Sequence, residues 1–277
     1  MRDKMEISLL VLTLNEEANM QLLLSSLSWC KDIVVLDSGS ADRTIEIANS
    51  FGVRVFSRPF DDFAAQRNYA LDNIGFKYPW LFHLDADERF TEELIEECGK
   101  VTAEDKFSGY YVPFKMMFMG KWLRHCGVYP GYQMRLMKIG EVRFAQKGHG
   151  QRETDAQRGI GYLENPLIHD NFSKGLEDWL DKHNQYSTME AVEAVKQAEN
   201  GKIDLSGLFA KNGLQRRRTL KNLSYRLPAR PWLKFIYMYF LRLGFLDGRP
   251  GLTYCSLQAL YEYFTVLKLK ELRSRNK

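Results

Sequence analysis

The sequence predicts an α/β fold built around a mostly parallel β-sheet. Short apolar runs alternate with segments of helical periodicity throughout residues 7–84. Residue types that begin or end helices separate the two kinds of segment, and acidic or amide side chains follow the apolar runs. Strands that alternate with helices in this way form right-handed β-α-β units, with helices flanking the sheet.

The first strand is expected at residues 7–14 (ISLLVLTL), a continuous apolar run typical of a buried strand. Asn15 then predicts a helix cap, because its side chain can accept a backbone N–H bond. Glu16 and Glu17 place negative charge in the first helical turn. Apolar residues at helical spacing complete this amphipathic helix: Met20, Leu23, Leu24 and Leu27.

The next elements repeat this arrangement. Residues 32–36 (DIVVL) predict a second strand, Ser40 can cap a helix over residues 41–50, and Gly52 ends that helix. The remaining expected elements are a strand at 53–56, a helix at 63–73, a strand at 80–84, short β-like runs over 109–169 and a polar helix at 176–200.

The composition excludes several classes of protein. The 277 residues are 45% hydrophobic and 27% charged, which suits a folded core and excludes disordered or collagen-like chains. The four cysteines lie far apart without Cys-x-x-Cys spacing, so neither a structural zinc nor a disulfide framework is expected. Residues 1–6 lack an apolar signal region, which argues against export and favours a cytoplasmic location.

Residues 208–277 are basic and rich in aromatic side chains. Residues 1–210 contain 24 Lys and Arg against 32 Asp and Glu, whereas residues 211–277 contain 15 against 3. The apolar stretches 232–246 and 252–267 include charged residues, so neither is a convincing membrane span. They fit helices in the interface of an anionic membrane. A helical hairpin packed on the preceding domain is the alternative, and both can hold.

Polar side chains follow three of the predicted strands. Because ligands bind outside the carboxyl ends of strands in parallel sheets, we expect these clusters to converge on one site. They are Thr13, Asn15 and Glu16 after the first strand, Asp37 to Ser40 after the second, and Asp85 to Asp87 after the fourth.

Asp85 and Asp87 indicate a divalent cation that also holds phosphate oxygens. Two carboxylates separated by one residue at a strand end can reach one Mg²⁺ or Mn²⁺ ion, which prefers oxygen ligands. A solvated acidic loop is the more common role of Asp-x-Asp, but the position after a strand favours the metal. Glu88 continues the acidic run, either at the surface or behind the site.

Asp37 can accept hydrogen bonds from a ribose or a base, while Gly39 lets the backbone turn closely. The alternative is an Asx turn that leads into a capped helix, which we favour for residues 38–40. The chain contains neither Gly-x-Gly-x-x-Gly nor a P-loop motif. A dinucleotide oxidoreductase or a P-loop phosphotransferase would therefore lack its phosphate-binding loop, and a metal must replace it.

Four motifs occur in order: LVLTLNEE (10–17), VLDSGSADRT (35–44), AQRNYA (65–70) and LDADE (84–88). Together they resemble the nucleotide-sugar domain of family-2 glycosyltransferases with the GT-A fold. The segments YPGYQMRL (129–136) and FLDGRPG (245–251) are similar to the bacterial lipopolysaccharide-core β-glucosyltransferase-like branch of that family. The similarity is strong over residues 7–153 and moderate in the tail.

This resemblance implies an inverting, metal-dependent hexosyltransferase whose donor is a nucleotide sugar, with UDP as the expected nucleotide. It implies Asp85 and Asp87 as ligands of Mg²⁺ or Mn²⁺, with Asp85 also on the nucleotide, and Arg67 near the uracil or diphosphate. The ion would neutralise the charge on the departing nucleoside diphosphate. The residues implied to contact the nucleoside are Thr13, Asn15, Glu16 and Asp37.

Inversion by direct displacement needs a base on the face opposite the leaving group. Some relatives have Tyr-Pro-Asp where this chain has Tyr129-Pro130-Gly131, so no acidic residue is available there. The resemblance instead implies Glu153, in the segment GHGQRE, as the base. His149 is the alternative, although a structural role in its loop is equally open.

Gln133 and Arg135 resemble part of the Gln-x-x-Arg-Trp element of processive members of the family. The spacing here is one residue short and no Trp follows, so processive polymerisation is not supported. Both residues could line the acceptor side or have a structural role in a strand. Trp122 could stack on an acceptor sugar, with buried packing as the alternative.

We therefore expect a GT-A domain over residues 1–207, with a nucleotide-sugar half (1–108) and an acceptor half (109–207), followed by a membrane-associating helical region (208–277). The expected acceptor is a lipopolysaccharide-core or lipid-linked saccharide at the inner face of the cell membrane, with no nucleic-acid partner. A sugar-nucleotide pyrophosphorylase is one alternative, but it needs a Gly-rich phosphate loop where this chain has the acidic TLNEE. A non-catalytic membrane- or nucleic-acid-binding module is the other.

Overall fold

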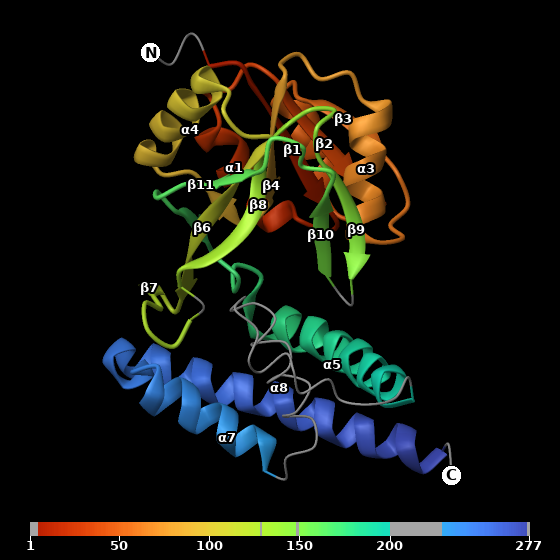
Figure 1. Cartoon of the computed structure of the whole chain (residues 1–277), viewed down its shortest axis with the longest axis vertical. Coiled ribbons are helices and arrows are strands. Elements are labelled where there is room, and N and C mark those ends of the chain that lie inside the picture. The colour runs from red at the N-terminus through yellow and green to blue at the C-terminus, as the bar shows by residue number, and fades with distance from the viewer. Residues whose placement is uncertain (1–4, 128, 148–149, 200–228, 276–277) are drawn as a thin grey trace. The chain divides into compact units, whose positions relative to one another are not determined.

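The structure is a computed structural model that describes residues 5–127, 129–147, 150–199 and 229–275 (Figure 1). These residues divide into two compact units. The first contains the described residues of 1–122 and 128–174, and the second those of 123–127 and 175–277. The division falls after residue 174, whereas residue 207 was the expected boundary, because the helix that begins at Gly175 packs on the C-terminal helix.

Four parallel strands form the first half of the sheet in the order β3-β2-β1-β4. β1 lies between β2 and β4 and is buried along almost its whole length, which explains its continuous apolar sequence. The predicted α/β fold is therefore confirmed. The strands are β1 (Ile7–Thr13), β2 (Ile33–Asp37), β3 (Arg54–Ser57) and β4 (Trp80–Asp85).

The remaining strands continue the sheet beyond β4. β8 pairs antiparallel with β4, β6 pairs antiparallel with β8, and the whole path reads β3-β2-β1-β4-β8-β6-β12-β5. β9 and β10 form a separate hairpin (Figure 1). The bounds are β5 (Glu88–Arg89), β6 (Gly109–Phe118), β7 (Lys121–Trp122), β8 (Gly131–Lys138), β9 (Arg143–Lys147), β10 (Gly150–Thr154), β11 (Ile160–Tyr162) and β12 (Leu167–His169).

Three of the four helices in the first unit, α1 to α3, were expected from the sequence, whereas α4 was not, and two predicted caps are wrong. α1 begins at Glu17, and Asn15 lies outside it in a left-handed conformation with φ 53°. α2 begins at Thr44, so Ser40 does not cap it. The loops after β1 and β2 bond to each other, and this competes with local capping. The helices are α1 (Glu17–Ser26), α2 (Thr44–Ser50), α3 (Phe63–Asn73) and α4 (Glu92–Glu104).

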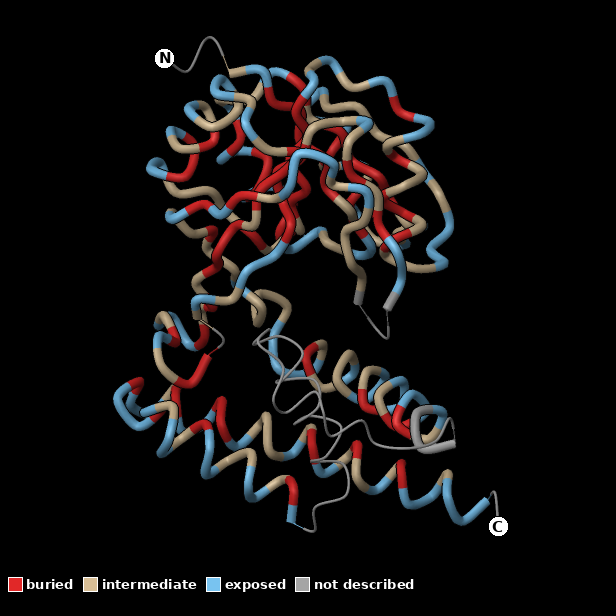
Figure 2. Tube along the Cα trace, in the orientation of Figure 1, coloured by how far each residue is buried: buried red, intermediate tan, exposed pale blue. Residues whose placement is uncertain are grey.

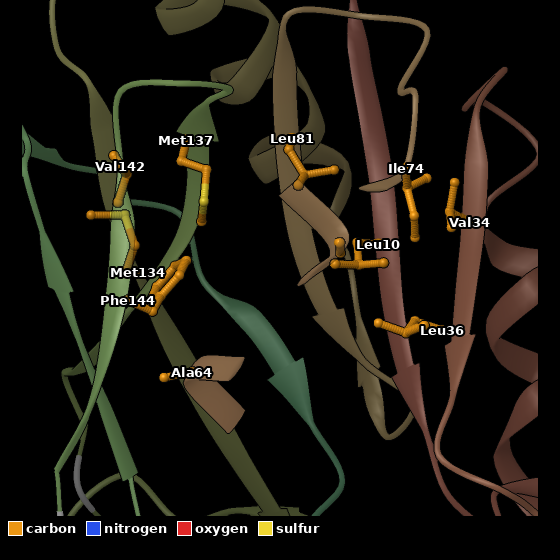
Figure 3. Close-up of a cluster of buried hydrophobic side chains, with 11 residues drawn as sticks. Leu10, Val34, Leu36, Ala64, Ile74, Leu81, Met134, Met137, Val142 and Phe144 are labelled. Atoms are coloured by element: carbon orange, nitrogen blue, oxygen red, sulfur yellow. The ribbon is translucent and has the colours of Figure 1, made fainter. Parts of the chain in front are cut away.

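A hydrophobic cluster packs against the parallel strands. It joins side chains of β1, β2 and β4 to side chains of β8, β9 and α3 (Figure 3). Figure 2 shows the buried residues concentrated along these strands. This packing anchors the strands whose carboxyl ends carry the polar clusters. Its buried members are Leu10, Val34, Leu36, Ala64, Ala70, Ile74, Leu81, Met134, Met137, Val142 and Phe144.

The second unit is helical. α5 and α7 both pack on the long helix α8. The segment 123–127 joins this unit because the buried carboxylate of Asp247 accepts the backbone N–H groups of Arg124, His125 and Cys126. Among the described residues, no helix is long and apolar enough to cross a membrane. The elements are α5 (Gly175–Glu199), α7 (Arg230–Ile236), the π-helix η3 (Tyr237–Leu241), the 3-10 helix η4 (Gly244–Asp247) and α8 (Gly248–Arg275).

Candidate active site

The sheet register brings the three polar clusters together. Thr13 at the end of β1 pairs with Asp37 at the end of β2, and Leu12 pairs with Asp85 at the end of β4. All three strands run in the same direction, so their following loops leave from one edge of the sheet.

Asp37 organises the loop after β2. Its side chain is completely buried and accepts hydrogen bonds from Thr13 Oγ1 at 2.9 Å and from the backbone N–H groups of Gly39 and Ser40, both at 2.8 Å. These are the bonds of an Asx turn. The turn considered for residues 38–40 is therefore present, and a nucleoside contact for Asp37 stays a prediction.

The loops after β1 and β2 are bonded to each other. The Asn15 backbone N–H donates to Ser40 Oγ at 2.8 Å, and Asn15 Oδ1 accepts from the backbone N–H of Ala41 at 2.8 Å. The Glu16 backbone N–H donates to Thr44 Oγ1 at 2.7 Å, while its carboxylate pairs with Lys174 at 2.7 Å. The two loops therefore form one cross-linked platform at the strand ends.

A buried arginine holds the turn that contains Asp85. Arg135 on β8 is 1% exposed, and its Nη2 donates to both Asp85 Oδ2 and Glu88 Oε1. Glu88 Oε2 accepts the backbone N–H of Asp85 at 3.0 Å. Burial raises the pKa of Asp85, but Arg135 and Arg67 outweigh it and hold that pKa well below its ordinary value. Burial raises the pKa of Glu88 by more than Arg135 lowers it.

Arg67 on α3 contacts the other oxygen of the same carboxylate. Its Nη2 lies 3.7 Å from Asp85 Oδ1, and its guanidinium lies 5.8 Å from the centre of the Phe144 ring. Burial lowers the pKa of Arg67 to about 10, so it keeps its charge at neutral pH. Asp85 thus lies between two guanidinium groups, while 39% of its side chain stays exposed. Two cations already balance this carboxylate, which weakens Asp85 as a metal ligand.

Asp87 lies beside a histidine that the sequence did not identify. Its Oδ2 is 3.3 Å from Nε2 of His169, the last residue of β12. β12 pairs with β5, and this brings His169 opposite Glu88. Burial lowers the pKa of His169, but the hydrogen bond and charge of Asp87 raise it to about 9. No local spacing relates His169 to Asp87, so only the sheet topology reveals this pair.

Asp87 offers an oxygen donor of the type that binds divalent ions. The raised pKa keeps His169 protonated at neutral pH, so its ring would offer a nitrogen donor only when an ion displaces that proton. Within the described parts of the chain, no group of three or more His, Cys, Asp or Glu is arranged to hold a metal ion. A pair of protein donors fits an ion that takes its other ligands from phosphate oxygens and water, as Mg²⁺ commonly does.

Glu153 lies on β10 with its carboxylate bonded to a tyrosine. The phenol of Tyr111 donates a hydrogen bond to Glu153 Oε1, and burial together with this bond raises the pKa of Tyr111. The Tyr162 ring lies 5.1 Å from the ring of Tyr111 and 5.1 Å from that of Tyr132. Glu153 therefore lies beside an aromatic cluster. His149 lies outside the described residues.

The three residues expected on the acceptor side lie in different surroundings. Arg135 lies beneath the Asp85 turn, as described above. Gln133 is exposed on β8. Trp122 on β7 is partly buried, with its ring 4.9 Å from that of Tyr129 and 4.8 Å from Lys115 Nζ. Acceptor contacts for Gln133 and Trp122 stay predictions.

Comparisons with known proteins find similarity to glycosyltransferases. Residues 8–143 match the family model described as Glycosyl transferase family 2. The chain is 27% identical over 279 residues to the lipopolysaccharide core biosynthesis glycosyltransferase LpsC of Rhizobium meliloti (strain 1021), covering 96% of this chain and 92% of that protein. It is 24% identical over 285 residues to an uncharacterized glycosyltransferase of Rickettsia typhi, covering 98% and 89%.

A solved structure shares the fold. The mannosyltransferase PcManGT from Pyrobaculum calidifontis, in complex with GDP-Man and Mn²⁺, superposes with a TM-score of 0.50 at 14% identity, covering 95% of this chain and 86% of that one. The predicted GT-A type of α/β fold agrees with this likeness.

Arg135→Met should lower the free energy of unfolding by about 3–5 kcal/mol, because it leaves Asp85 and Glu88 without their shared cation. The double variant Arg135→Met/Glu88→Gln should lose less, since one buried charge is removed with its partner. Urea unfolding followed by circular dichroism measures both. Arg143→Met is the control, because its ion pair with Asp72 is about half exposed and should contribute about 0–1 kcal/mol. Equal losses for Arg135→Met and Arg143→Met would contradict this role of Arg135.

Proposed function

We propose, from the premise that residues 8–143 are a glycosyltransferase family 2 domain, that this chain transfers a hexose from a nucleotide sugar to a saccharide acceptor. UDP is the proposed nucleotide, and a lipopolysaccharide-core or lipid-linked saccharide is the proposed acceptor. One observation carries the proposal. Arg135 holds the turn that contains Asp85, and this turn places Asp87 beside His169 at the edge of the sheet. The relationship to LpsC supports the class of acceptor.

The cross-linked loops after β1 and β2 form the proposed nucleoside site. Thr13, Asn15, Glu16 and Asp37 belong to this platform, whose internal bonds keep it in one conformation before a ligand arrives. Preorganisation of this kind lowers the entropy cost of binding. Arg67 lies at the same edge, where its charge favours a diphosphate.

Asp87 and His169 are the residues that would hold Mg²⁺ or Mn²⁺. Such an ion acts as a Lewis acid and neutralises the charge on the leaving diphosphate. Asp85, already balanced by Arg67 and Arg135, orients the turn and keeps an exposed side for the nucleotide. PcManGT, which shares the fold, was solved with GDP-Man and Mn²⁺.

Glu153 is the proposed base. A direct displacement at the anomeric carbon needs a carboxylate that takes the proton from the acceptor hydroxyl as the new bond forms. Tyr111 holds one oxygen of Glu153 by a hydrogen bond, which orients the carboxylate and leaves its second oxygen for the acceptor. Displacement by a nucleophile from the opposite face inverts the anomeric configuration.

A sugar-nucleotide pyrophosphorylase is the weaker alternative. It requires backbone N–H groups after the first strand to bind phosphate. Here those of Asn15, Glu16 and Glu17 are bonded to Ser40, Thr44 and Asp42.

A saturating nucleotide sugar should stabilise the protein only when Mn²⁺ is present. At 100 times the dissociation constant, the gain is about 2.7 kcal/mol, because the ligand binds the folded state alone. Differential scanning fluorimetry with a panel of nucleotide sugars measures the shift in melting temperature. Asp87→Asn should abolish the Mn²⁺-dependent part, whereas the control Asp61→Asn, at an exposed ion pair with Arg58, should keep it. An undiminished Mn²⁺-dependent shift in Asp87→Asn would remove Asp87 from the metal site.

Glu153→Gln should lower turnover by about 10²-fold or more, because the acceptor hydroxyl loses its base. The donor-dependent thermal shift should stay near the wild-type value, since Glu153 has no proposed donor contact. Initial-rate measurement of released nucleoside diphosphate provides the test, with the exposed Glu164→Gln as the matched control. Turnover within a factor of about three of wild type would exclude Glu153 as the base.

A further inference from the structure

The second unit exposes a continuous group of large apolar side chains. Six of them, on α7 and η3, are each at least 46% exposed, with Trp232 at 71% and Leu241 at 72%. Soluble proteins rarely gather so many large apolar residues on one surface without an interaction partner. The six are Trp232, Leu233, Ile236, Tyr237, Phe240 and Leu241.

The spacing of these residues places them on one side of the helix. They form two rows of positions four apart, one from residue 232 to 240 and the other from 233 to 241. Residues four apart share a face of an α-helix, and the wider π-helical turn of η3 keeps the rows aligned. Met238, in contrast, is buried within the unit. We call this surface the α7–η3 face.

α8 carries a second exposed apolar row. Leu252, Leu260, Tyr263 and Leu267 are 39–49% exposed and follow helical spacing. The exposed basic residues Arg249 and Lys270 continue this row by three residues at either end. The opposite side of α8 is buried and includes Tyr254, Cys255, Thr265 and Leu269.

The charge of this region complements an anionic surface. Residues 211–277 contain 15 basic and 3 acidic residues. Each acidic side chain already has partners within the unit: Asp247 accepts N–H groups of segment 123–127, Glu262 pairs with Arg230 at 2.7 Å, and Glu271 pairs with Arg275 at 2.6 Å. These three carboxylates therefore do not neutralise the excess positive charge of residues 211–277.

We propose that the α7–η3 face and the exposed row of α8 dock on an anionic lipid bilayer, with both helices lying in the plane of the interface. Trp and Tyr prefer this interface, and Leu, Ile and Phe bury their side chains among the acyl chains. Basic residues add attraction to anionic headgroups. This inference rests on the proposed function, which supplies an acceptor carried by a lipid. It adds the surface of the protein that contacts the membrane.

Co-flotation of the full chain with vesicles of phosphatidylethanolamine and phosphatidylglycerol tests the proposal. Wild-type protein should float with these vesicles and much less with pure phosphatidylcholine, and high salt should weaken binding. The variant Trp232→Ser/Phe240→Ser/Leu241→Ser should lose about tenfold or more in partitioning. The fluorescence of wild-type protein should shift to the blue on vesicle binding, and Trp232→Phe should remove most of the shift.

The matched control replaces three exposed apolar residues elsewhere, Leu22→Ser/Leu176→Ser/Met189→Ser, and should bind vesicles like wild type. Donor-dependent thermal shifts, recorded for every variant, show that each is folded and separate a failure here from a failure of the proposed reaction. Equal flotation of the two triple variants would overturn the proposal. The proposal would also be overturned if the wild-type chain did not float with anionic vesicles, or if it dimerised through the α7–η3 face in lipid-free solution.

Discussion

One buried guanidinium between two carboxylates sets the geometry of the candidate active site. Arg135 lies on β8, whereas Asp85 and Glu88 lie at the end of β4 and at the start of β5. Charges so deeply buried are tolerated only when they are paired and hydrogen-bonded. The pairing of β8 with β4 therefore holds the Asp85 turn, and the pairing of β12 with β5 brings His169 beside Asp87.

The strands were predictable, and the starts of two helices were not. Continuous apolar runs identified β1, β2 and β4 to within about one residue, because strands covered on both faces consist mainly of apolar residues. Asn15 and Ser40 looked like helix caps, but they bond across two loops that are neighbours only in the folded sheet. Asp62 and Thr91 do cap their helices, because each side chain accepts a backbone N–H from the first helical turn. Capping is local, and long-range bonds override it.

The candidate site was predictable only where its residues share a short motif. Asp85 and Asp87 were identified from one triplet, and Asp37 from its place after a strand. The same triplet did not indicate that Asp85 and Asp87 have different charged neighbours. Asp85 lies between Arg67 and Arg135, which come from other elements of the fold. His169 was missed because β12 reaches Asp87 through its pairing with β5 and β6. Residues that are brought together only by strand pairing have no characteristic spacing in the sequence.

The most direct measurement is the position of Mn²⁺ in crystals grown with a nucleotide sugar, located by its anomalous scattering. One peak is expected in contact with Asp87 and with the diphosphate, with His169 turned toward it and Asp85 still bonded to Arg135. A bound donor with no peak near Asp87, or a peak held by Asp85 after Arg135 has moved away, would contradict this expectation.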